Sequence, residues 1–452
     1  MKCIIRKKMK TFRMGGIHPK AYKFSAGMKI KPATIPQQVI IPLGQNLGGP
    51  SLAIVEKGDL VKVGQMIGKA SGFISANIHS SVSGRVNRID EALDASGSKV
   101  PSVFIDVTGD EWLETIDKST VVNRECTLTA SEIIKKISES GIVGLGGATF
   151  PTHVKLSPPP GKMAEVLIIN AVECEPYLTC DHQLMLEKGE EILVGVSILM
   201  KALDVNNAVV GIENNKKDAI ELLQKLAKTF KGIEIVPLKV QYPQGGEKQL
   251  IDAIMGRQVP SGSLPIEVGA VVQNVATTFA IYEAVQKNKP LFERIVTITG
   301  KSMANHGNYR ARIGTPLSVI VEQAGGVPED TGKIVAGGPM MGKALSSLEV
   351  AVSKGTSGVL FIPTLESSRK KMNNCMRCAK CIRACPMGLE PYLLMKESEL
   401  SMWPEMEDNR IMDCIECGCC AFSCPSNRPL LDHVRLGKST VGKIIRNRQA
   451  KK

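Results

Sequence analysis

Hydrophobic residues between positions 38 and 108 fall in short runs that Gly, Pro, Asn and Asp separate. Runs of this length, bounded by turn residues, predict β-strands. The expected strands are Val39–Ile41, Leu52–Val55, Gly84–Ile89 and Ser102–Val107. We therefore expect a small β domain over residues 38–108, preceded by an N-terminal extension over residues 1–37.

The pattern changes between residues 125 and 290, where apolar, β-branched runs alternate with longer helical stretches. The expected strands are Val166–Ile169, Ala208–Ile212, Ile233–Val240 and Gly269–Gln273, and the expected helices include Glu190–Leu203 and Lys217–Phe230. This alternation predicts an α/β domain with a buried parallel sheet. Sheets of this kind bind their ligands at the carboxyl ends of the strands.

Residues 291–355 return to short strands with Gly turns, at Ile295–Thr299, Leu317–Val321 and Ile334–Ala336, which predicts a small mixed sheet. A cysteine-rich module is expected over residues 365–433, and its first residues, 365–375, read as a polar linker. Within the module, Tyr392–Glu399 and Glu405–Met412 favour helices. A basic tail follows over residues 434–452. The predicted fold class is multidomain, with α/β, β and α parts.

A chain of 452 residues is too long for one ordinary core, and 43% hydrophobic with 22% charged residues is typical of globular proteins. No apolar run is long enough to cross a bilayer; the longest candidate, Ile266–Val285, is interrupted by polar residues. The N-terminus lacks the apolar stretch of a secretory signal. We therefore expect a protein kept in the cytoplasm, with at most peripheral membrane contact.

The formal net charge of +13 indicates an anionic partner, and the stretch from Arg435 to Lys452 has seven Lys or Arg and no acid. Aromatic residues make up only 4% and do not alternate with the bases, so nucleic acid is not expected. An anionic membrane surface or an acidic redox partner would need only a diffuse positive field. A solvated tail that aids solubility is an equally open interpretation.

Eight of the 13 cysteines form two sets, Cys375-x2-Cys378-x2-Cys381-x3-Cys385-Pro386 and Cys414-x2-Cys417-x2-Cys420-x3-Cys424-Pro425. Each cysteine of the second set follows its counterpart by 39 positions (414 − 375 = 39), so the module is duplicated. This spacing is that of two-cluster bacterial ferredoxins, in which the fourth cysteine of each set binds the other [4Fe–4S] cluster. The predicted ligands are Cys375, Cys378, Cys381 and Cys424 for one cluster, and Cys385, Cys414, Cys417 and Cys420 for the other.

Zinc is the alternative metal for such a module. Zinc sites, however, usually use separated Cys-x2-Cys pairs and not a triple followed by Cys-Pro. Cys419 is a ninth cysteine inside the second set, and an exchange of roles between Cys419 and Cys420 stays open.

Four polar or glycine-rich stretches lie beside the strands of the α/β domain: Gly144–Lys155, Asn170–Tyr177, Tyr242–Glu247 and Asn274–Thr277. The first precedes a strand and lets backbone amides approach a phosphate or a flat ring, although a tight turn alone would explain its glycines. The other three directly follow strands, where ligands are expected. Glu173 and Glu175 could equally stand at a solvated helix start, and Cys174 and Cys180 are expected to be small buried residues.

The β domain carries a pattern of its own. Its stretch Val55–Gln65 resembles the turn-and-strand pattern of biotinyl and lipoyl barrel-sandwich domains. The matching hairpin, Ala76–Gly84, has no lysine that could carry a cofactor, and its His79 is expected to be structural. We expect this fold without the carrier function.

The four stretches of the α/β domain resemble the FMN- and NADH-binding flavoprotein subunit of respiratory complex I. The order of domains along the whole chain resembles the RnfC family, which belongs to the Rnf ion-translocating ferredoxin:NAD oxidoreductases. The resemblance implies a Rossmann-like FMN/NADH domain, a soluble-ligand-binding β-grasp domain and a helical two-cluster ferredoxin domain. Implied FMN contacts are Gly144, Gly146, Gly147, Ala148, Asn170, Glu173, Tyr242, Gly245, Gly246, Asn274 and Thr277. Implied NADH contacts are Phe150, Lys155, Glu175 and Glu247.

The resemblance further implies an electron-transfer enzyme subunit that contains FMN and two [4Fe–4S] clusters. Its implied partners are NADH or NAD⁺, the other Rnf subunits and, through them, ferredoxin, and its implied place is the cytoplasmic face of the cell membrane. Thr149, Val172, Gly246 and Ala276 depart from the complex I pattern. A soluble reductase with the same cofactors, such as a cobalamin reductase, and a cluster-bearing scaffold without flavin remain alternatives.

Overall fold

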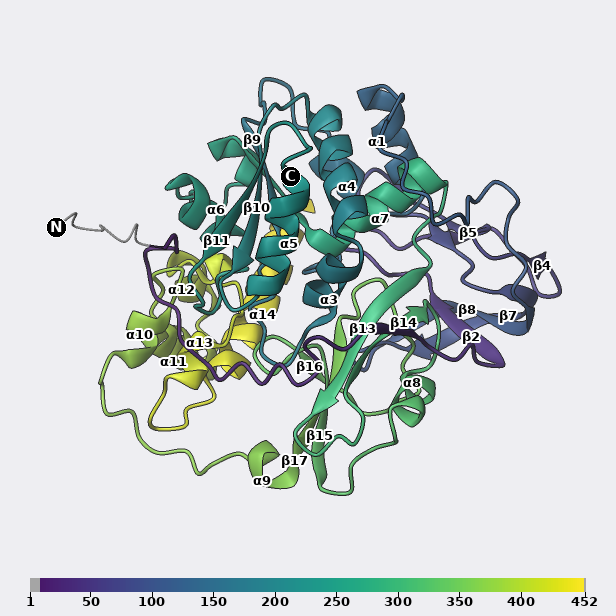
Figure 1. Ribbon diagram of the computed structural model, residues 1–452. Coiled ribbons are helices and arrows are strands. Elements are labelled where there is room, and N and C mark those ends of the chain that lie inside the picture. The colour runs from purple at the N-terminus through teal and green to yellow at the C-terminus, as the bar shows by residue number, and fades with distance from the viewer. Residues whose placement is uncertain (1–8, 451–452) are drawn as a thin grey trace.

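The computed structural model describes residues 9–450, and Figure 1 shows its arrangement. The first unit is a sandwich of two antiparallel sheets, β2-β8-β7-β4 and β3-β5-β6. Their bounds are Gln38–Pro42 (β2), Leu52–Ala53 (β3), Leu60–Val61 (β4), Met66–Lys69 (β5), Ile78–His79 (β6), Ser83–Leu93 (β7) and Lys99–Gly109 (β8). All four strands expected here are confirmed. His79 is buried, and burial lowers its pKa to about 3, so the ring is a neutral core residue.

The second unit is a four-stranded parallel sheet with the order β11-β10-β9-β12. Its strands are Val166–Asn170 (β9), Ala208–Glu213 (β10), Ile233–Leu238 (β11) and Ala270–Asn274 (β12), as the hydrophobic runs predicted. In β9, Leu167 and Ile169 pack into one core and Ile168 into another, so both faces of the sheet are covered. This is the doubly wound arrangement expected from alternating strands and helices.

Helices cover the two faces of this sheet. Five helices, α1 (Ala130–Glu139), α3 (Cys180–Glu187), α4 (Gly189–Leu203), α5 (Lys217–Ala227) and α7 (Val275–Lys287), contact one another in one layer. Helix α6 (Glu247–Met255) contacts β9 and β10, and its Leu250 and Ile251 share the core of Ile168. The short helix α2 (Thr152–Lys155) follows the glycine-rich loop, and a 3-10 turn (Pro265–Val268) precedes β12.

The third unit is a six-stranded sheet with the order β1-β14-β13-β17-β15-β16. Its strands are Ile30–Pro32 (β1), Glu293–Gly300 (β13), Gly307–Arg312 (β14), Thr331–Ala336 (β15), Lys343–Ala344 (β16) and Gly358–Pro363 (β17). The strand predicted at Leu317–Val321 is wrong, because this segment begins helix α8 (Leu317–Gln323). Leu317, Ile320 and Val321 are buried at helical spacing, and Pro316 precedes the first turn.

The predicted N-terminal extension, of which residues 1–8 lie outside the described part, connects three units. Lys10 pairs with Leu238 and Ile17 with Tyr242 in the α/β unit, the amide of Gly16 donates to the carbonyl of Ala384 in the cysteine module, and β1 joins the six-stranded sheet beside β14. In Figure 1 this dark purple segment runs across the molecule from the cysteine module to β14. We refer to residues 10–33 as the N-terminal strap.

The cysteine module is helical, as predicted. It contains α10 (Lys380–Ala384), α11 (Pro391–Glu399), α12 (Trp403–Asp408), a 3-10 turn (Ile411–Asp413), α13 (Cys419–Phe422) and α14 (Leu430–Ala450), and α9 (Thr364–Ser367) precedes the linker. The predicted boundary at residue 433 lies inside α14. Val434 and Val441 of α14 are buried with Leu394 and Met406, so most of the expected tail is a core helix of the module. In the described residues we find no helix with the length and hydropathy needed to span a membrane.

Candidate functional site

The carboxyl ends of β9 and β12 lie side by side where the strand order of the parallel sheet reverses. Asn170 and Asn274 are the last residues of these strands and are register partners. A crevice at such a reversal is the usual ligand site of open α/β sheets. The structure thus brings together two predicted FMN contacts that lie far apart in the sequence.

Both asparagine side chains already hold backbone groups. The Oδ1 atom of Asn274 accepts hydrogen bonds from the amides of Ala276 (2.8 Å) and Thr277 (3.2 Å), and so caps helix α7. The Nδ2 atom of Asn170 donates to the carbonyl of Gly245 at 2.8 Å. These bonds fix the two side chains at the sheet end between β9 and β12, which we call the crevice after the usual ligand site of such sheets.

The glycine-rich loop is held in place at Leu145. The amide of Leu145 donates to Thr277 Oγ1 at 2.8 Å, and its carbonyl accepts from Arg294 Nη2 at 2.6 Å. The next three residues, Gly146, Gly147 and Ala148, are exposed. A Cβ on Gly146 would lie 2.5 Å from Asn274 Nδ2, whereas one on Gly147 would meet nothing within 4 Å. Open glycine backbone beside two asparagines fits a flat ring with polar edges, such as a flavin.

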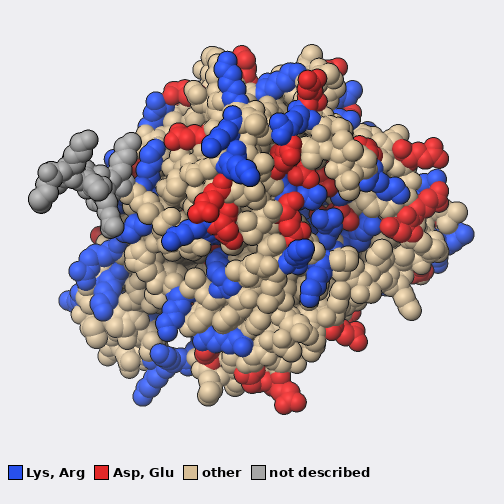
Figure 2. All heavy atoms as spheres, in the orientation of Figure 1, with Lys and Arg blue, Asp and Glu red and all other residues tan. Residues whose placement is uncertain are grey.

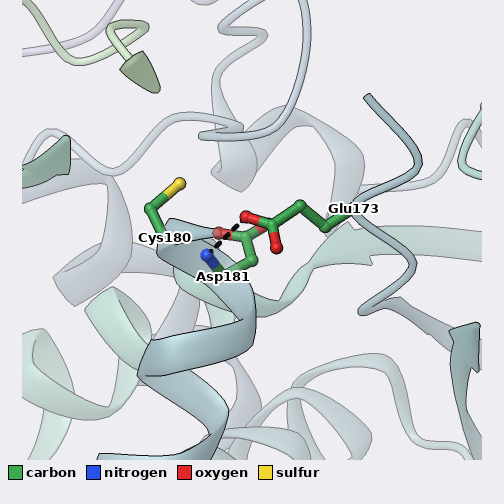
Figure 3. Close-up of side chains that lie close together, drawn as sticks. All are labelled: Glu173, Cys180 and Asp181. Atoms are coloured by element: carbon green, nitrogen blue, oxygen red, sulfur yellow. Dashed lines mark hydrogen bonds between the residues drawn. The ribbon is translucent and has the colours of Figure 1, made fainter. Parts of the chain in front are cut away.

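Glu173 and Asp181 form a carboxylate pair next to Asn274, and Figure 3 shows the two carboxylates together with Cys180. Glu173 accepts hydrogen bonds from the amides of Asp181 (2.8 Å) and His182 (3.2 Å) at the start of α3, and Asn274 Nδ2 donates to Asp181 Oδ2 at 2.7 Å. Glu173 therefore does stand at a helix start, but in a half-buried position. Cys180 completes a group whose ligand atoms lie within 4.8 Å of one another. Because the carboxylates already accept these hydrogen bonds, the group is explained without a metal ion.

Burial perturbs the titration of this layer. Burial, and secondly the charge of Glu173, raises the pKa of Asp181 to about 6. Burial also raises the pKa of Cys174 to about 12 and that of Cys180 well above its ordinary value, so both remain thiols at neutral pH. This agrees with the expectation that the two cysteines are small buried residues.

Two lysines that no sequence motif marked hold the loop after β9. Lys23 of the N-terminal strap donates through Nζ to the carbonyls of Glu173 (2.9 Å), Glu175 (2.9 Å) and Leu178 (2.5 Å). Lys216, which is almost fully buried, donates to the carbonyl of Val172 at 2.7 Å. The loop needs such support, because Glu173 has a positive φ of 44°.

The stretch Tyr242–Glu247 follows β11, and its last residue, Glu247, begins helix α6 directly after Gly246. Two predicted NADH contacts meet here, since Lys155 Nζ lies 2.7 Å from Glu247 Oε1. Both side chains are partly exposed. Phe150 closes the glycine loop through its carbonyl, which accepts from the amide of Gly144 at 2.9 Å. Lys155 and Glu247 are therefore available to a ligand that enters beside the glycine loop.

Glu175, the fourth predicted NADH contact, is engaged elsewhere. Its Oε1 accepts hydrogen bonds from the amides of Met340 (2.7 Å) and Met341 (2.9 Å), in the turn between β15 and β16. Burial raises its pKa above the ordinary value. The carboxylate thus binds the α/β unit to the six-stranded sheet, and does not pair with Lys155 or Glu247.

The structure gathers one predicted cysteine quartet around a single small cavity. Cys385 of the first set and Cys414, Cys417 and Cys420 of the second line it, together with Cys419 and apolar residues such as Leu389 and Val434. Cys385 and Cys417 are buried, and Cys414 and Cys420 are partly exposed; we call these four residues the buried quartet. Their sulfurs are free thiols. Four cysteines around an apolar cavity fit a [4Fe–4S] cluster, because such a cluster is held by cysteine thiolates.

The remaining four, Cys375, Cys378, Cys381 and Cys424, we call the exposed quartet. Cys375 is exposed, and the other three are partly exposed. Burial raises the pKa of Cys381, and the nearby Cys424 adds to this effect, whereas backbone hydrogen bonds partly oppose it. The neighbourhood of Cys381 and Cys424 follows the crossed pattern that the sequence predicted.

The buried quartet adjoins the α/β unit directly. Tyr242 Oη donates to the carbonyl of Cys417 at 2.9 Å, and Gln249 Nε2 of α6 donates to the carbonyl of Pro386 at 3.3 Å. Cys419 is fully buried, with its sulfur 4.0 Å from the Tyr242 carbonyl. The strap seals this contact, because a Cβ on Gly15 would lie 2.5 Å from the carbonyl carbon of Cys385.

A sheet-end crevice suited to a flavin, in contact with a thiol quartet, is typical of flavin and iron–sulfur electron-transfer proteins. Residues 137–283 match the model of the Nuo51 FMN-binding domain, and residues 295–344 match the SLBB domain. Residues 10–110 match the RnfC barrel sandwich hybrid domain, a range that includes most of the N-terminal strap.

Relatives in several bacteria align with nearly the whole chain. The C subunit of the proton-translocating ferredoxin:NAD(+) oxidoreductase complex of Clostridium ljungdahlii is 44% identical over 434 residues, which are 95% of this chain and 94% of the relative. The C subunit of the Na(+)-translocating complex of Acetobacterium woodii is 42% identical over 435 residues, 95% of this chain and 97% of the relative. Its counterpart in the ion-translocating oxidoreductase complex of Rhodobacter capsulatus is 41% identical over 388 residues, 84% and 73% of the two chains. The chain belongs to the RnfC family.

Proposed function

We propose that this chain is the NADH-facing subunit of an Rnf complex and passes electrons between NADH, FMN and two [4Fe–4S] clusters. The family assignment supports electron transfer in an ion-translocating ferredoxin:NAD⁺ oxidoreductase. The match to an FMN-binding domain supports the flavin. We infer that the chain sits peripherally at the cytoplasmic face of the membrane with the other subunits, and that the complex couples to ferredoxin and to movement of Na⁺ or H⁺.

The proposed flavin site is the crevice between β9 and β12. Asn170 and Asn274 would orient the polar edges of FMN, and the open backbone of the glycine loop would lie against the ring. The other proposed contacts are Gly144, Gly146, Gly147, Ala148, Glu173, Tyr242, Gly245, Gly246 and Thr277. Of these, Glu173 acts through Asp181 and Asn274, and Thr277 acts by holding Leu145.

The proposed NADH contacts are Phe150, Lys155 and Glu247, which lie on the glycine loop, on α2 and at the start of α6. Lys155 would offer its ammonium to the dinucleotide phosphates, since the Lys155–Glu247 pair is partly exposed. Glu175, in the loop after β9, instead joins the α/β unit to the turn between β15 and β16 through the amide of Met340.

Bound FMN would supply the conversion between the two-electron chemistry of NADH and the one-electron chemistry of the clusters. We propose that Cys385, Cys414, Cys417 and Cys420 hold the cluster nearer the flavin, and that Cys375, Cys378, Cys381 and Cys424 hold the outer one. The observation that carries this order is the buried contact between Tyr242 and Cys417. It links the loop after β11 to one quartet, while the other quartet has no fully buried cysteine and includes the exposed Cys375.

The domain assignment follows the proposed function: barrel sandwich at 38–108, FMN/NADH domain at 125–290, β-grasp at 291–355 and ferredoxin domain from 365. The sandwich domain would serve as a structural unit, because its hairpin has no carrier lysine. We include α14 in the ferredoxin domain, since it supplies part of that core.

The test is anaerobic purification of the chain followed by addition of NADH. We expect bound FMN whose absorbance bleaches with NADH, and about eight irons per chain, as two four-iron clusters require. A chain that holds iron but no flavin would contradict the proposal and favour a cluster-bearing scaffold. Flavin reduction by NADH without association with the membrane subunits would favour a soluble reductase.

A further inference from the structure

The linker before α10 and helix α10 itself carry a concentration of unpaired positive charge. Between Arg369 and Cys385 the sequence has six Lys or Arg and no Asp or Glu. Arg369 forms an ion pair with Asp432, and Arg383 donates to the carbonyl of Cys378. Within residues 9–450, Lys370, Lys371, Arg377 and Lys380 are exposed and take part in no ion pair with another side chain.

Other bases of the same module are neutralised internally. Arg428 pairs with Glu399, Lys438 with Glu416, and Arg448 with Glu407. Lys443 and Arg446 of α14 are exposed and take part in no ion pair among the described residues, so part of the basic character of α14 stays available as well. Four further unpaired bases lie close together on the linker and α10, beside the exposed quartet.

Figure 2 shows this distribution on one side of the molecule. Lys and Arg gather on the lower left lobe, over α10 and the segment that leads into it, with almost no acidic side chain among them in this view. An uncompensated basic area of this kind attracts an acidic partner and orients it before contact.

Large apolar side chains stand exposed among these bases. Met376, between two cysteines of the exposed quartet, is 64% exposed, and Phe422, two residues before Cys424, is 56% exposed. Tyr392 of α11, a helix that contacts α10, is also exposed, and its hydroxyl donates to Glu390 Oε2 at 3.1 Å. Apolar residues within a polar rim are typical of protein–protein contact areas.

These residues form one continuous surface. The amide of Asn373 donates to the carbonyl of Ser426 at 3.0 Å, and Asn427 Nδ2 donates to the carbonyl of Lys371 at 3.1 Å. The linker is thereby fastened beside the loop that follows Cys424. Helix α10 packs against α13, which carries Phe422.

We propose that this surface docks an acidic, redox-active protein or protein domain at the exposed quartet. We define it by Lys370, Lys371, Arg377 and Lys380 around Met376 and Phe422, and call it the α10 face. An anionic lipid surface would match the charge but offers no redox centre for the exposed cysteines. The proposal rests on the proposed function, since it assigns the outer cluster its partner.

The test compares two charge-reversal variants of the full chain, purified anaerobically and reduced with dithionite, with the excess removed. The first carries K370E, K371E, R377E and K380E. The matched control carries K217E, K225E, K228E and K231E, four exposed lysines on and after α5. The probe is an acidic bacterial ferredoxin, and its reduction is followed by stopped-flow absorbance at low and at about 0.3 M salt, where surface charges are largely screened.

For the wild-type chain we expect a rate that falls steeply with salt. We expect the α10-face variant to be slower by about 10- to 100-fold at low salt and nearly independent of salt, and the control to change less than about 2-fold. Iron content and the visible spectrum verify that both variants keep their clusters. Equal rates in all three proteins, or equal losses in both variants, would overturn the proposal.

A vesicle assay tests the other occupant. We would measure sedimentation of the same proteins with vesicles of phosphatidylglycerol and phosphatidylcholine. Loss of vesicle binding in the α10-face variant, with unchanged ferredoxin reduction, would assign the surface to lipid and contradict the proposal. Because dithionite bypasses the NADH site, failure of the flavin proposal would leave this result interpretable.

Discussion

The crevice between β9 and β12 and the cysteine module differ in how far the polypeptide alone completes them. In the crevice, Asn170, Asn274 and Glu173 already hold backbone groups; the two asparagines end buried strands, and Glu173 lies in the loop after β9. In the module, the eight thiols are free and surround a cavity or face solvent. The proposed flavin site is therefore preformed by hydrogen bonds, whereas the proposed cluster sites would require metal to complete them.

The largest expected effect comes from removing a ligand of the buried quartet. Cys417→Ser should lose one cluster, about four of about eight irons, because each cubane needs its four thiolates. It should also nearly abolish electron transfer from NADH to an external acceptor, since the cluster beside Tyr242 would be missing. Iron analysis and acceptor reduction measure both effects.

Cys419→Ser is the matched control, because Cys419 lines the same cavity next to a ligand. It should keep about eight irons. Loss of iron in Cys419→Ser with retention in Cys420→Ser would exchange the roles of these two residues.

Loss of Asn274, the residue that caps α7 in the crevice, should have a smaller effect than loss of a cluster ligand. Asn274→Ala removes the cap of α7 and the partner of Asp181, so we expect a loss of about 1–2 kcal/mol in unfolding free energy and about 30-fold weaker FMN binding, or about 2 kcal/mol. Urea unfolding and flavin fluorescence titration measure the two. Asn274→Ser should recover the stability, because serine caps helices well, but not the flavin affinity. Full recovery of both would show that the contact with Asp181 is unimportant.

A substitution of Lys23 would test whether the N-terminal strap holds the loop after β9 in place for FMN binding. Lys23→Met leaves the carbonyls of Glu173, Glu175 and Leu178 without their ammonium donor. We expect FMN binding to weaken about 10-fold, in the range of a lost hydrogen bond to a charged group, and iron content to stay unchanged. Lys20→Met, at an exposed strap position, is the control. An iron loss as large as the flavin loss would mean that the strap supports the whole molecule and not the crevice.

The smallest effect concerns the pH dependence of stability. The pKa of Asp181 is raised to about 6 by burial and by Glu173, so this residue favours folding at low pH and loses that contribution as the pH rises through 6. Asp181→Asn keeps an acceptor for Asn274 and removes the titration. Its unfolding free energy should exceed that of the wild type above about pH 6 and converge with it near about pH 4. Parallel pH profiles for the two proteins would contradict this assignment.

Much of the crevice could be predicted from sequence because its signals are local. The runs that form β9 and β12 mark where those strands end, and Asn170 and Asn274 are their last residues. The crossed cysteine quartets likewise follow from a fixed spacing. The sequence could not reveal contacts between distant segments. Lys23 lies 150 residues from Glu173, and no local pattern links the two.

The wrong strand and the boundary that fell inside α14 have a physical reason as well. Leu317–Val321 is rich in β-branched residues, but burial at positions i, i+3 and i+4 favoured a helix over the intrinsic preference of these residues. In the segment after residue 433, polar and basic residues concealed a sparse apolar stripe that includes Val434 and Val441. A stripe this narrow has meaning only once a packing partner is known.

The most direct test of the account is the order in which the two quartets receive electrons. We would mix each of two anaerobic variants, Cys375→Ser and Cys417→Ser, separately with NADH. Freeze-quench electron paramagnetic resonance would follow reduction of the cluster that each variant retains. The account predicts that the cluster of the buried quartet, left in Cys375→Ser, is reduced at the wild-type rate, while that of the exposed quartet, left in Cys417→Ser, is reduced far more slowly. Equally fast reduction of the exposed cluster in Cys417→Ser would contradict it.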